Sequence, residues 1–85
     1  WDAAKDHLNQ KKHGVAFEQA KQAFQDTKRV IAKDILHSTK EERFFCFGKV
    51  NGLVLTVRFT MRDNKIRIFG AGCWREGAKK YEKNH

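Results

Sequence analysis

Four arginines and one histidine in the middle of the chain are suited to chemistry on a phosphate group. They are Arg43, Arg58, Arg62, Arg67 and His37. A guanidinium group binds phosphate through two parallel hydrogen bonds, and an imidazole exchanges a proton near neutral pH. Metal-free RNA cleavage uses both, because the 2′-hydroxyl loses a proton as it attacks phosphorus and negative charge develops on the phosphorane.

A β-hairpin places two of these arginines on one face of a predicted sheet. The dipeptide Asn51-Gly52 predicts a type I′ turn, because both of its positions require a positive φ. A two-residue turn there pairs Val50 with Leu53 and, farther along, Phe44 with Phe59. Side chains alternate between the faces of a strand. The apolar face then carries Leu53, Leu55, Val57 and Phe59, and the opposite face carries Arg43, Phe45, Phe47, Lys49, Val54, Thr56, Arg58 and Thr60.

A third strand is expected over Lys65–Phe69, after a turn near Asp63. With its isoleucines pointing inward, Phe59 aligns with Ile66, and this alignment places Arg58 directly opposite Arg67. Like charges that face each other across strands are destabilising, and a bound phosphate would neutralise them.

Aromatic side chains are interleaved with these arginines. RNA recognition uses cations for phosphates and aromatic rings for splayed bases, so this face is interpreted as an RNA-binding surface. Its residues are Arg43, Phe45, Phe47, Arg58 and Phe69, extended by Arg75 and Lys79 farther along the chain. The alternative is a face half covered by a helix, with solvated arginines at its rim.

The composition supports an anionic partner. The chain has 85 residues, enough for one domain with one modest core. Its formal net charge is +8, and from Arg58 onward eight basic residues stand against three acidic ones. This balance points to a polyanion or an acidic protein.

Cysteine usage and hydropathy bear on the compartment. Cys46 and Cys73 do not form a disulfide framework, and the chain has no secretory segment and no apolar run long enough for a membrane span. We therefore expect a cytoplasmic protein without a membrane partner. The chain begins at Trp1 without a methionine, so we expect a few native residues before it.

The predicted order of elements is ααββββα, an α+β domain with a four-stranded antiparallel meander sheet, helices one and two on its apolar face, and a C-terminal helix. The first helix runs from Ala3 to about Lys12, between an Asp2 cap and Gly14. The other segments are expected at Phe17–Gln25 (helix, weakly capped by Ala16), Lys28–Lys33 (strand), Asp34–Glu42 (polar loop) and Trp74–Lys83 (helix). Gly70 and Gly72 are expected to break the last strand.

Several of these residues, taken in order, resemble the BrnT family of toxins. The matching residues at the start are Trp1-Asp2…Lys5…Asn9…Lys12-His13-Gly14-Val15…Phe17-Glu18…Ala20…Phe24…Asp26. They continue with Asp34…His37-Ser38…Glu41-Glu42-Arg43, Gly48, Thr60…Arg62 and Ile66-Arg67-Ile68, and the similarity extends to Tyr81-Glu82.

The resemblance implies a RelE-like fold and a ribonuclease toxin of a type II toxin–antitoxin pair. Its target would be RNA, mRNA in particular. Its partner would be a BrnA-like antitoxin that carries a ribbon-helix-helix DNA-binding domain, so contact with DNA is indirect. A dimer or a toxin–antitoxin heterotetramer is the implied assembly. One position departs from the family, because Gly72 stands where an arginine is expected and Arg75 is the nearest substitute.

The candidate catalytic residues are His37, Glu42, Arg62, Arg67 and Tyr81. Arg62 and Arg67 match the family pattern. His37 is the first acid–base candidate, against a structural role as a hydrogen-bond donor beside Ser38. Glu42 is a candidate base, unless the pair Glu41-Glu42 binds Arg43 or Lys40. Tyr81 is a candidate to donate a proton or to stack on a base, unless it only packs.

No cofactor is expected, and no metal site is predicted. The histidines (His7, His13, His37 and His85) and the two cysteines lack ligand spacing, and Gly70-Ala71-Gly72 lacks the context of a nucleotide-binding loop. Three functions follow: a metal-independent endoribonuclease toxin, a catalytically inactive member that binds RNA or protein, and a basic structural module.

Overall fold

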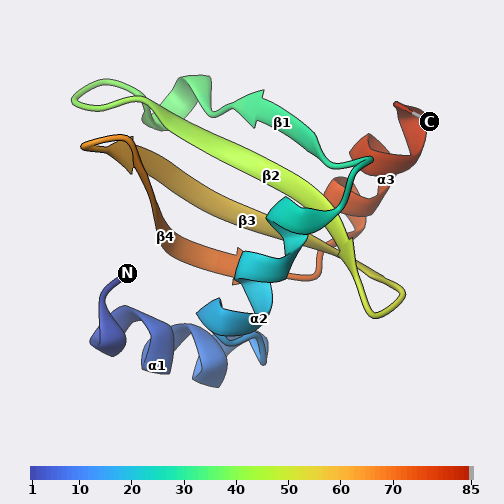
Figure 1. Cartoon of the computed structure of the whole chain (residues 1–85), viewed down its shortest axis with the longest axis horizontal. Helices are drawn as coiled ribbons and strands as arrows, with labels where there is room; N and C mark the ends of the chain where they lie inside the picture. The colour runs from blue at the N-terminus through green and yellow to red at the C-terminus, as the bar shows by residue number, and fades with distance from the viewer. Residues whose placement is uncertain (85) are drawn as a thin grey trace.

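The computed structural model describes residues 1–84, and His85, one of the histidines considered as a metal ligand, lies outside the described residues. Figure 1 shows the elements, which are α1 (Ala3–His13), α2 (Phe17–Lys21), η1 (Gln22–Gln25), β1 (Val30–Lys33), η2 (Ile35–His37), β2 (Arg43–Val50), β3 (Leu53–Arg62), β4 (Lys65–Gly72) and α3 (Arg75–Lys83). The four strands form one antiparallel sheet in the order β1-β2-β3-β4. The α+β class, the meander and the C-terminal helix are therefore confirmed.

The prediction of two N-terminal helices is only half right. α1 has the expected caps, since Asp2 accepts the Ala4 N–H and Gly14 adopts a left-handed φ of 69°. The second segment is α-helical over only five residues and continues as the 3-10 turn η1. Ala16 provides no cap, and Asp6 of α1 accepts the Phe17 N–H instead, at 2.8 Å. So short a helix depends on tertiary contacts.

The first hairpin forms as predicted. Asn51 and Gly52 have φ values of 50° and 84°, as a type I′ turn requires. Val50 pairs with Leu53, and the register continues to Phe44 opposite Phe59. The first hairpin therefore carries Arg43 and Arg58 on one face.

The second hairpin has a different register from the predicted one. Asp63 and Asn64 both have positive φ, so a tight turn joins β3 and β4. As a result Thr60, and not Arg58, lies opposite Arg67. Ile66 lies beside the turn and is 46% exposed, so the expectation that it points into the core is also wrong.

A β-bulge then changes which residues of β4 point to each face of the sheet. Phe59 pairs with Ile68 while the preceding Arg58 pairs with Gly70, so Phe69 is the extra residue. Beyond the bulge, Ala71 joins Ile68 in the core. The strand continues through Gly72, so the glycines do not break it as expected.

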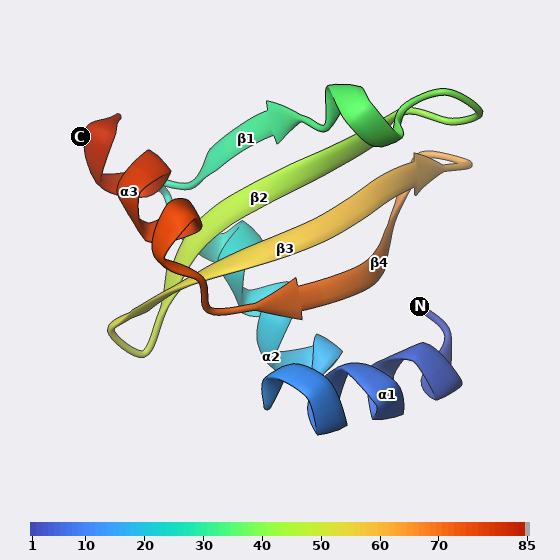
Figure 2. The same cartoon turned by 180° about the vertical axis from the view of Figure 1, so that it is seen from behind.

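Opposite faces of the sheet are covered by different helices (Figures 1 and 2). α1, α2 and η1 cover the apolar face, where Leu55, Val57 and Phe59 are buried as predicted. Asn9 fastens α1 to β4, because its side-chain amide donates to the Ala71 carbonyl and accepts the Ala71 N–H. The helix and the edge strand are thus held in a fixed relation.

The other face is covered only at one end. α3 packs there on β2 and β3, where Tyr81 joins Phe47 and Val54 in a second apolar cluster. Figure 2 shows that α3 leaves the far end of the strands free, beside η2 and the β3–β4 turn. This face is therefore covered by α3 at one end and uncovered at the other.

Candidate functional site

Two arginines flank one buried threonine at the uncovered end of the sheet. Arg43 of β2 pairs with Thr60 of β3, and Thr60 pairs with Arg67 of β4. Thr60 is 2% exposed, and its hydroxyl donates to the Glu42 carbonyl at 2.6 Å. Directly paired residues share a face. The sheet therefore places two partly exposed guanidinium side chains on one row.

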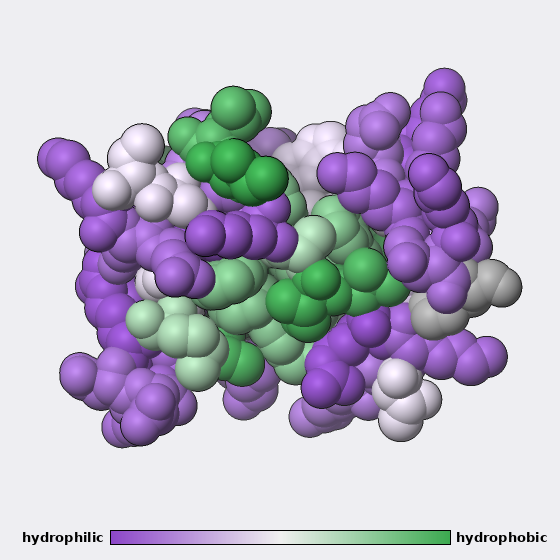
Figure 3. All heavy atoms as spheres, turned by 90° about the horizontal axis from the view of Figure 1, so that it is seen from above, coloured by the Kyte–Doolittle hydropathy of each residue, from purple (hydrophilic) through white to green (hydrophobic). Residues whose placement is uncertain are grey.

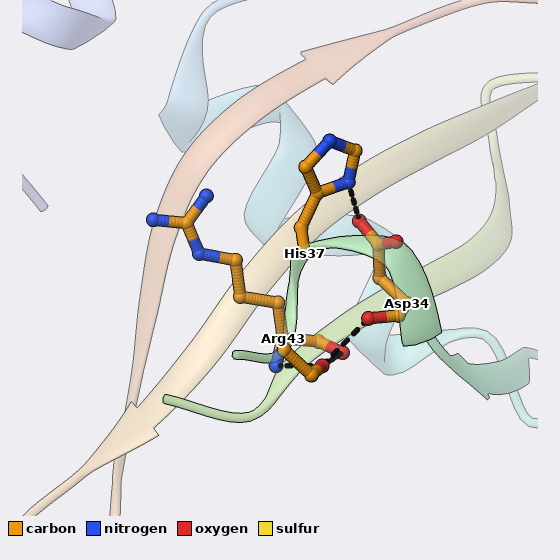
Figure 4. A network of polar contacts seen from close by, with 4 residues as sticks. Asp34, His37 and Arg43 are labelled. Atoms are coloured by element: carbon orange, nitrogen blue, oxygen red, sulfur yellow. Dashed lines mark hydrogen bonds and ion pairs between the residues drawn. The ribbon is translucent and has the colours of Figure 1, made fainter. Parts of the chain in front are cut away.

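The loop after β1 is fastened to the start of β2 by Ser38. The Ser38 hydroxyl donates to the Asp34 carbonyl at 2.6 Å and accepts the Arg43 N–H at 3.0 Å. The Asp34 N–H donates to the Arg43 carbonyl at 2.7 Å. This network holds η2 against the strand that carries Arg43, as Figure 4 shows.

His37 and Asp34 form a hydrogen-bonded pair beside Arg43 (Figure 4). The Asp34 side chain is nearly buried, and one carboxylate oxygen lies 2.8 Å from Nδ1 of His37. A carboxylate accepts, so Nδ1 carries the proton and the lone pair of the neutral ring lies on Nε2. The His37 side chain is 59% exposed, so this ring is accessible to a ligand. Both predicted roles, proton transfer and structural bonding, remain compatible with this geometry.

An open pocket of about 450 Å³ joins these groups. It is named the η2 pocket here, and it is lined by Leu36, His37, Thr39, Lys40, Glu41, Arg43 and Arg62. Arg62 also lines the neighbouring hollow that contains Arg67. The structure thus groups His37, Arg43, Arg62 and Arg67 at one end of the sheet.

Glu41, and not the predicted Glu42, is the carboxylate of this pocket. Both of its oxygens accept from Arg62, at 3.2 and 3.3 Å. This hydrogen bonding to Arg62 lowers the pKa of Glu41, and Arg43 and Arg67 add to the effect. Glu42 is exposed, and its backbone carbonyl accepts the hydrogen bond from Thr60. The partner of Glu41 is therefore Arg62, whereas the sequence suggested Arg43 or Lys40.

The three predicted RNA-binding phenylalanines differ in accessibility. Phe69 is partly exposed, with Cζ of Arg43 at 4.7 Å and Cζ of Arg58 at 5.7 Å from its ring centroid. Phe45 is partly exposed and stacks on Phe47, with ring centroids 5.8 Å apart. Phe47 is 2% exposed beneath α3, so it offers no free ring to a base.

The predicted residues on α3 lie at the other end of the sheet (Figure 2). Arg75 and Lys79 are exposed there, away from the η2 pocket. Tyr81 is 7% exposed, and its hydroxyl donates to Asp26 at 2.6 Å. This hydrogen bond raises the pKa of Tyr81, with burial as a smaller cause. Tyr81 is therefore buried in the second apolar cluster and hydrogen-bonded there, away from the η2 pocket.

The aromatic ring of Trp74 packs directly against the backbone of Gly72. A Cβ atom at this position would lie 2.7 Å from Cζ2 of Trp74 and closer still to Cη2. The backbone at Gly72 has no positive φ, so the glycine is needed for this close approach and not for a sharp turn. An arginine here would displace Trp74.

Other features of the described chain carry less chemistry. Within residues 1–84, no three His, Cys, Asp or Glu side chains are grouped as metal ligands. Both cysteines are free, and burial raises the pKa of Cys46 to about 12. Across the same residues, no helix has the length and apolar character needed to cross a membrane.

Hydrophobic side chains gather over β1 and η2, as the view in Figure 3 shows. Ile31, Ile35 and Leu36 are exposed there, and Leu36 also lines the η2 pocket. Exposed apolar side chains that gather in one region mark a candidate interaction surface.

The sequence interpretation missed Asp34 and Ser38 as parts of the site. The signal available was the spacing Asp34…His37-Ser38, since an Asp three residues before a His in a tight turn can reach its Nδ1.

Comparison with known proteins agrees with the resemblance found in the sequence. A family model described as "Ribonuclease toxin, BrnT, of type II toxin-antitoxin system" matches residues 1–77. No curated protein matches the chain significantly.

Proposed function

This chain belongs to the BrnT family of type II ribonuclease toxins, and we propose that it cleaves RNA without a metal ion in the η2 pocket. The observation that carries the proposal is that His37, whose ring is hydrogen-bonded to Asp34, lines the same pocket as Arg43 and Arg62. A base and several phosphate-binding cations are thereby presented together at the uncovered end of the sheet.

In the proposed reaction, Nε2 of His37 accepts the proton of the RNA 2′-hydroxyl. The 2′-oxygen forms a bond to phosphorus, the bond from phosphorus to the 5′-oxygen breaks, and the leaving oxygen takes a proton from water. The hydroxide that remains takes the proton back from His37, which restores the neutral ring. The product is a 2′,3′-cyclic phosphate. Asp34 orients the ring by accepting from Nδ1, and the imidazolium that forms is stabilised by this carboxylate.

The arginines stabilise the charge that builds on the phosphorane. Arg43, Arg62 and Arg67 are the candidates, and each preorganised donor contributes about 3 kcal/mol to the transition state. Tyr81 has a structural role in this reaction, since its hydroxyl is bound to Asp26 away from the pocket, and Glu42 remains an alternative base.

The test is cleavage of a labelled single-stranded RNA in EDTA by the wild type and by Arg67→Ala. We expect the wild type to cleave and the variant to lose about 100-fold in rate, since one charge-stabilising donor is removed. Lys83→Ala, an exposed lysine of α3, is the control and should keep the wild-type rate. Loss of wild-type cleavage in EDTA would contradict metal independence.

A second candidate function is binding of RNA or protein without cleavage. The observation that favours it is the Trp74 ring over Gly72, which excludes the arginine expected at this position from the family resemblance. A folded wild type that binds the RNA but leaves it intact, also with ribosomes added, would support this function.

The partner, the fold family and the compartment complete the proposal. We infer a BrnA-like antitoxin that covers the basic face and contacts the apolar patch of Ile31, Ile35 and Leu36, with DNA bound only through the antitoxin. The four-stranded meander with helices on both faces supports a RelE-like fold. Cys46 and Cys73 are both free, as in a reducing cytoplasm. The assembly we propose is a dimer or a toxin–antitoxin heterotetramer.

A further inference from the structure

A second basic pocket lies between α1 and the edge strand β4. Its volume is about 240 Å³, and we name it the α1–β4 pocket. Lys5, Leu8, Asn9, Lys12, His13, Arg58 and Phe69 line it. Asn9 fastens the helix to the strand, so the walls of this pocket are held together by buried hydrogen bonds.

Arg58 reaches this pocket because residue 70 is a glycine. Arg58 lies opposite Gly70, and a Cβ atom at Gly70 would lie 2.6 Å from Nη2 and 2.7 Å from Nε of Arg58. The guanidinium group therefore rests directly on the β4 backbone. Its Nε is buried and has no hydrogen-bond partner within residues 1–84.

The positive charge of this pocket is not compensated by acidic side chains. Lys5, Lys12 and Arg58 form no ion pair in the part of the chain that the structure describes. The nearest carboxylate along α1, Asp6, instead accepts from the Phe17 N–H and the Gln10 amide. Three cations around a small hollow, one of them partly desolvated, favour an anion.

Phe69 connects the two basic pockets. It lines the α1–β4 pocket, and its ring contacts both the guanidinium of Arg58 and that of Arg43, a residue of the η2 pocket. A partly exposed ring between two phosphate-binding groups suits a nucleobase between two phosphates. This alternation favours a nucleic acid strand over an acidic polypeptide.

We propose that the α1–β4 pocket binds a backbone phosphate of the RNA strand whose scissile phosphate lies in the η2 pocket. The inference rests on the proposed function for the identity of the strand. It assigns Lys5, Lys12 and Arg58 to phosphate binding and Phe69 to base stacking. The substrate site then spans the sheet from η2 to α1, so a dinucleotide fills only part of it.

The test compares Lys12→Glu with Lys11→Glu. Both lysines are exposed in the last turn of α1, and the charge change is the same, but only Lys12 lines the pocket. The probe is a labelled single-stranded RNA with 2′-O-methyl groups, which cannot be cleaved, and its affinity is measured in EDTA at several salt concentrations. A labelled dinucleotide of the same chemistry is the short probe.

We expect Lys12→Glu to weaken binding of the long probe by about 10-fold more than Lys11→Glu, and its salt slope to fall by about 0.7 for each lost phosphate contact. Gly70→Ala, which displaces Arg58, should give a similar loss, with circular dichroism reporting its folding. The dinucleotide should not distinguish the two lysine variants.

Equal losses of RNA affinity in Lys11→Glu and Lys12→Glu would overturn the assignment of the α1–β4 pocket as a phosphate site. An equal sensitivity of a poly-glutamate peptide to Lys12→Glu would overturn its assignment to RNA. If RNA cleavage depends on Arg67 but Lys11→Glu and Lys12→Glu bind the long probe with equal affinity, this inference is rejected and the proposed function stands. Selective loss in Lys12→Glu with no cleavage by the wild type would support the pocket and reject the ribonuclease.

Discussion

The indole of Trp74 lies directly over Gly72, so close that a Cβ atom at Gly72 would be 2.7 Å from Cζ2 of the ring. We expect Gly72→Ala to lower the free energy of unfolding by about 1–3 kcal/mol, the usual cost of overpacking. Urea denaturation measures this loss. Gly72→Arg should destabilise further and should not raise any RNA cleavage.

The double variant Gly72→Ala/Trp74→Ala is the control for that prediction. Once the ring is removed, the added methyl group has room, so Gly72→Ala should cost less than it does in the wild type. The same cost in both backgrounds would show that Trp74 is not the source of the clash.

His37 should be needed for the chemical step more than for binding. We expect His37→Gln to lower the single-turnover rate of RNA cleavage by about 100-fold or more, within the range for general acid–base catalysis. Asp34→Asn should lower it less. His7→Gln, an exposed histidine of α1, is the matched control and should keep the rate. An unchanged rate in His37→Gln would restrict His37 to a structural role.

Glu41 should weaken RNA binding, because its carboxylate is paired with the Arg62 guanidinium that would otherwise bind a phosphate. We expect Glu41→Gln to bind a non-cleavable RNA more tightly and to steepen the salt slope by about 0.7, the contribution of one additional phosphate contact. Fluorescence anisotropy measures both. Glu42→Gln removes the same charge next to it without releasing Arg62, so it should give a smaller gain.

Stability should fall above pH 10 because of Tyr81. Its hydrogen bond to Asp26 raises the pKa in the folded chain above the ordinary value of 10.0. The unfolded chain loses this proton first as the pH rises. The contribution of Tyr81 to the free energy of unfolding is therefore complete below pH 10 and declines above it. Thermal unfolding of the wild type and Tyr81→Phe checks this, since the variant should show a smaller decline.

The two cysteines should react differently with a thiol reagent. Burial raises the pKa of Cys46 to about 12, whereas Cys73 is exposed. We expect one rapidly reacting thiol in the native protein at about pH 8 and two in denaturant, since the thiolate is the nucleophile. Cys73→Ser should abolish the rapid phase. Rapid reaction of both thiols in the native state would contradict the burial of Cys46.

Local features of the sequence were enough to predict most of the fold. Asn51-Gly52 determines the first hairpin, because only residues that tolerate positive φ fit its turn, and alternation then assigns the face of each side chain. The Asp2 and Gly14 caps likewise determined where α1 begins and ends. His37, Arg62 and Arg67 were also selected from the sequence, as candidates whose catalytic roles await the experiments above.

The register of β4 was decided by tertiary packing. A two-residue turn and a bulge at Phe69 give Arg67 and Arg58 the partners Thr60 and Gly70, whereas alternation alone placed the two arginines opposite each other. A bulge leaves no periodic signal in a sequence, because it inserts one residue into a pattern of period two.

The partners of the site residues were also determined only by the folded chain. The sequence identified the residue types for phosphate chemistry, since guanidinium and imidazole groups carry that capacity wherever they lie. The spacing of Asp34 and His37 hints at their contact, but the sequence could not show that Glu41 binds Arg62 or that Arg58 lies over Gly70 toward α1. Those relations depend on which loops and edges the fold brings within hydrogen-bond distance.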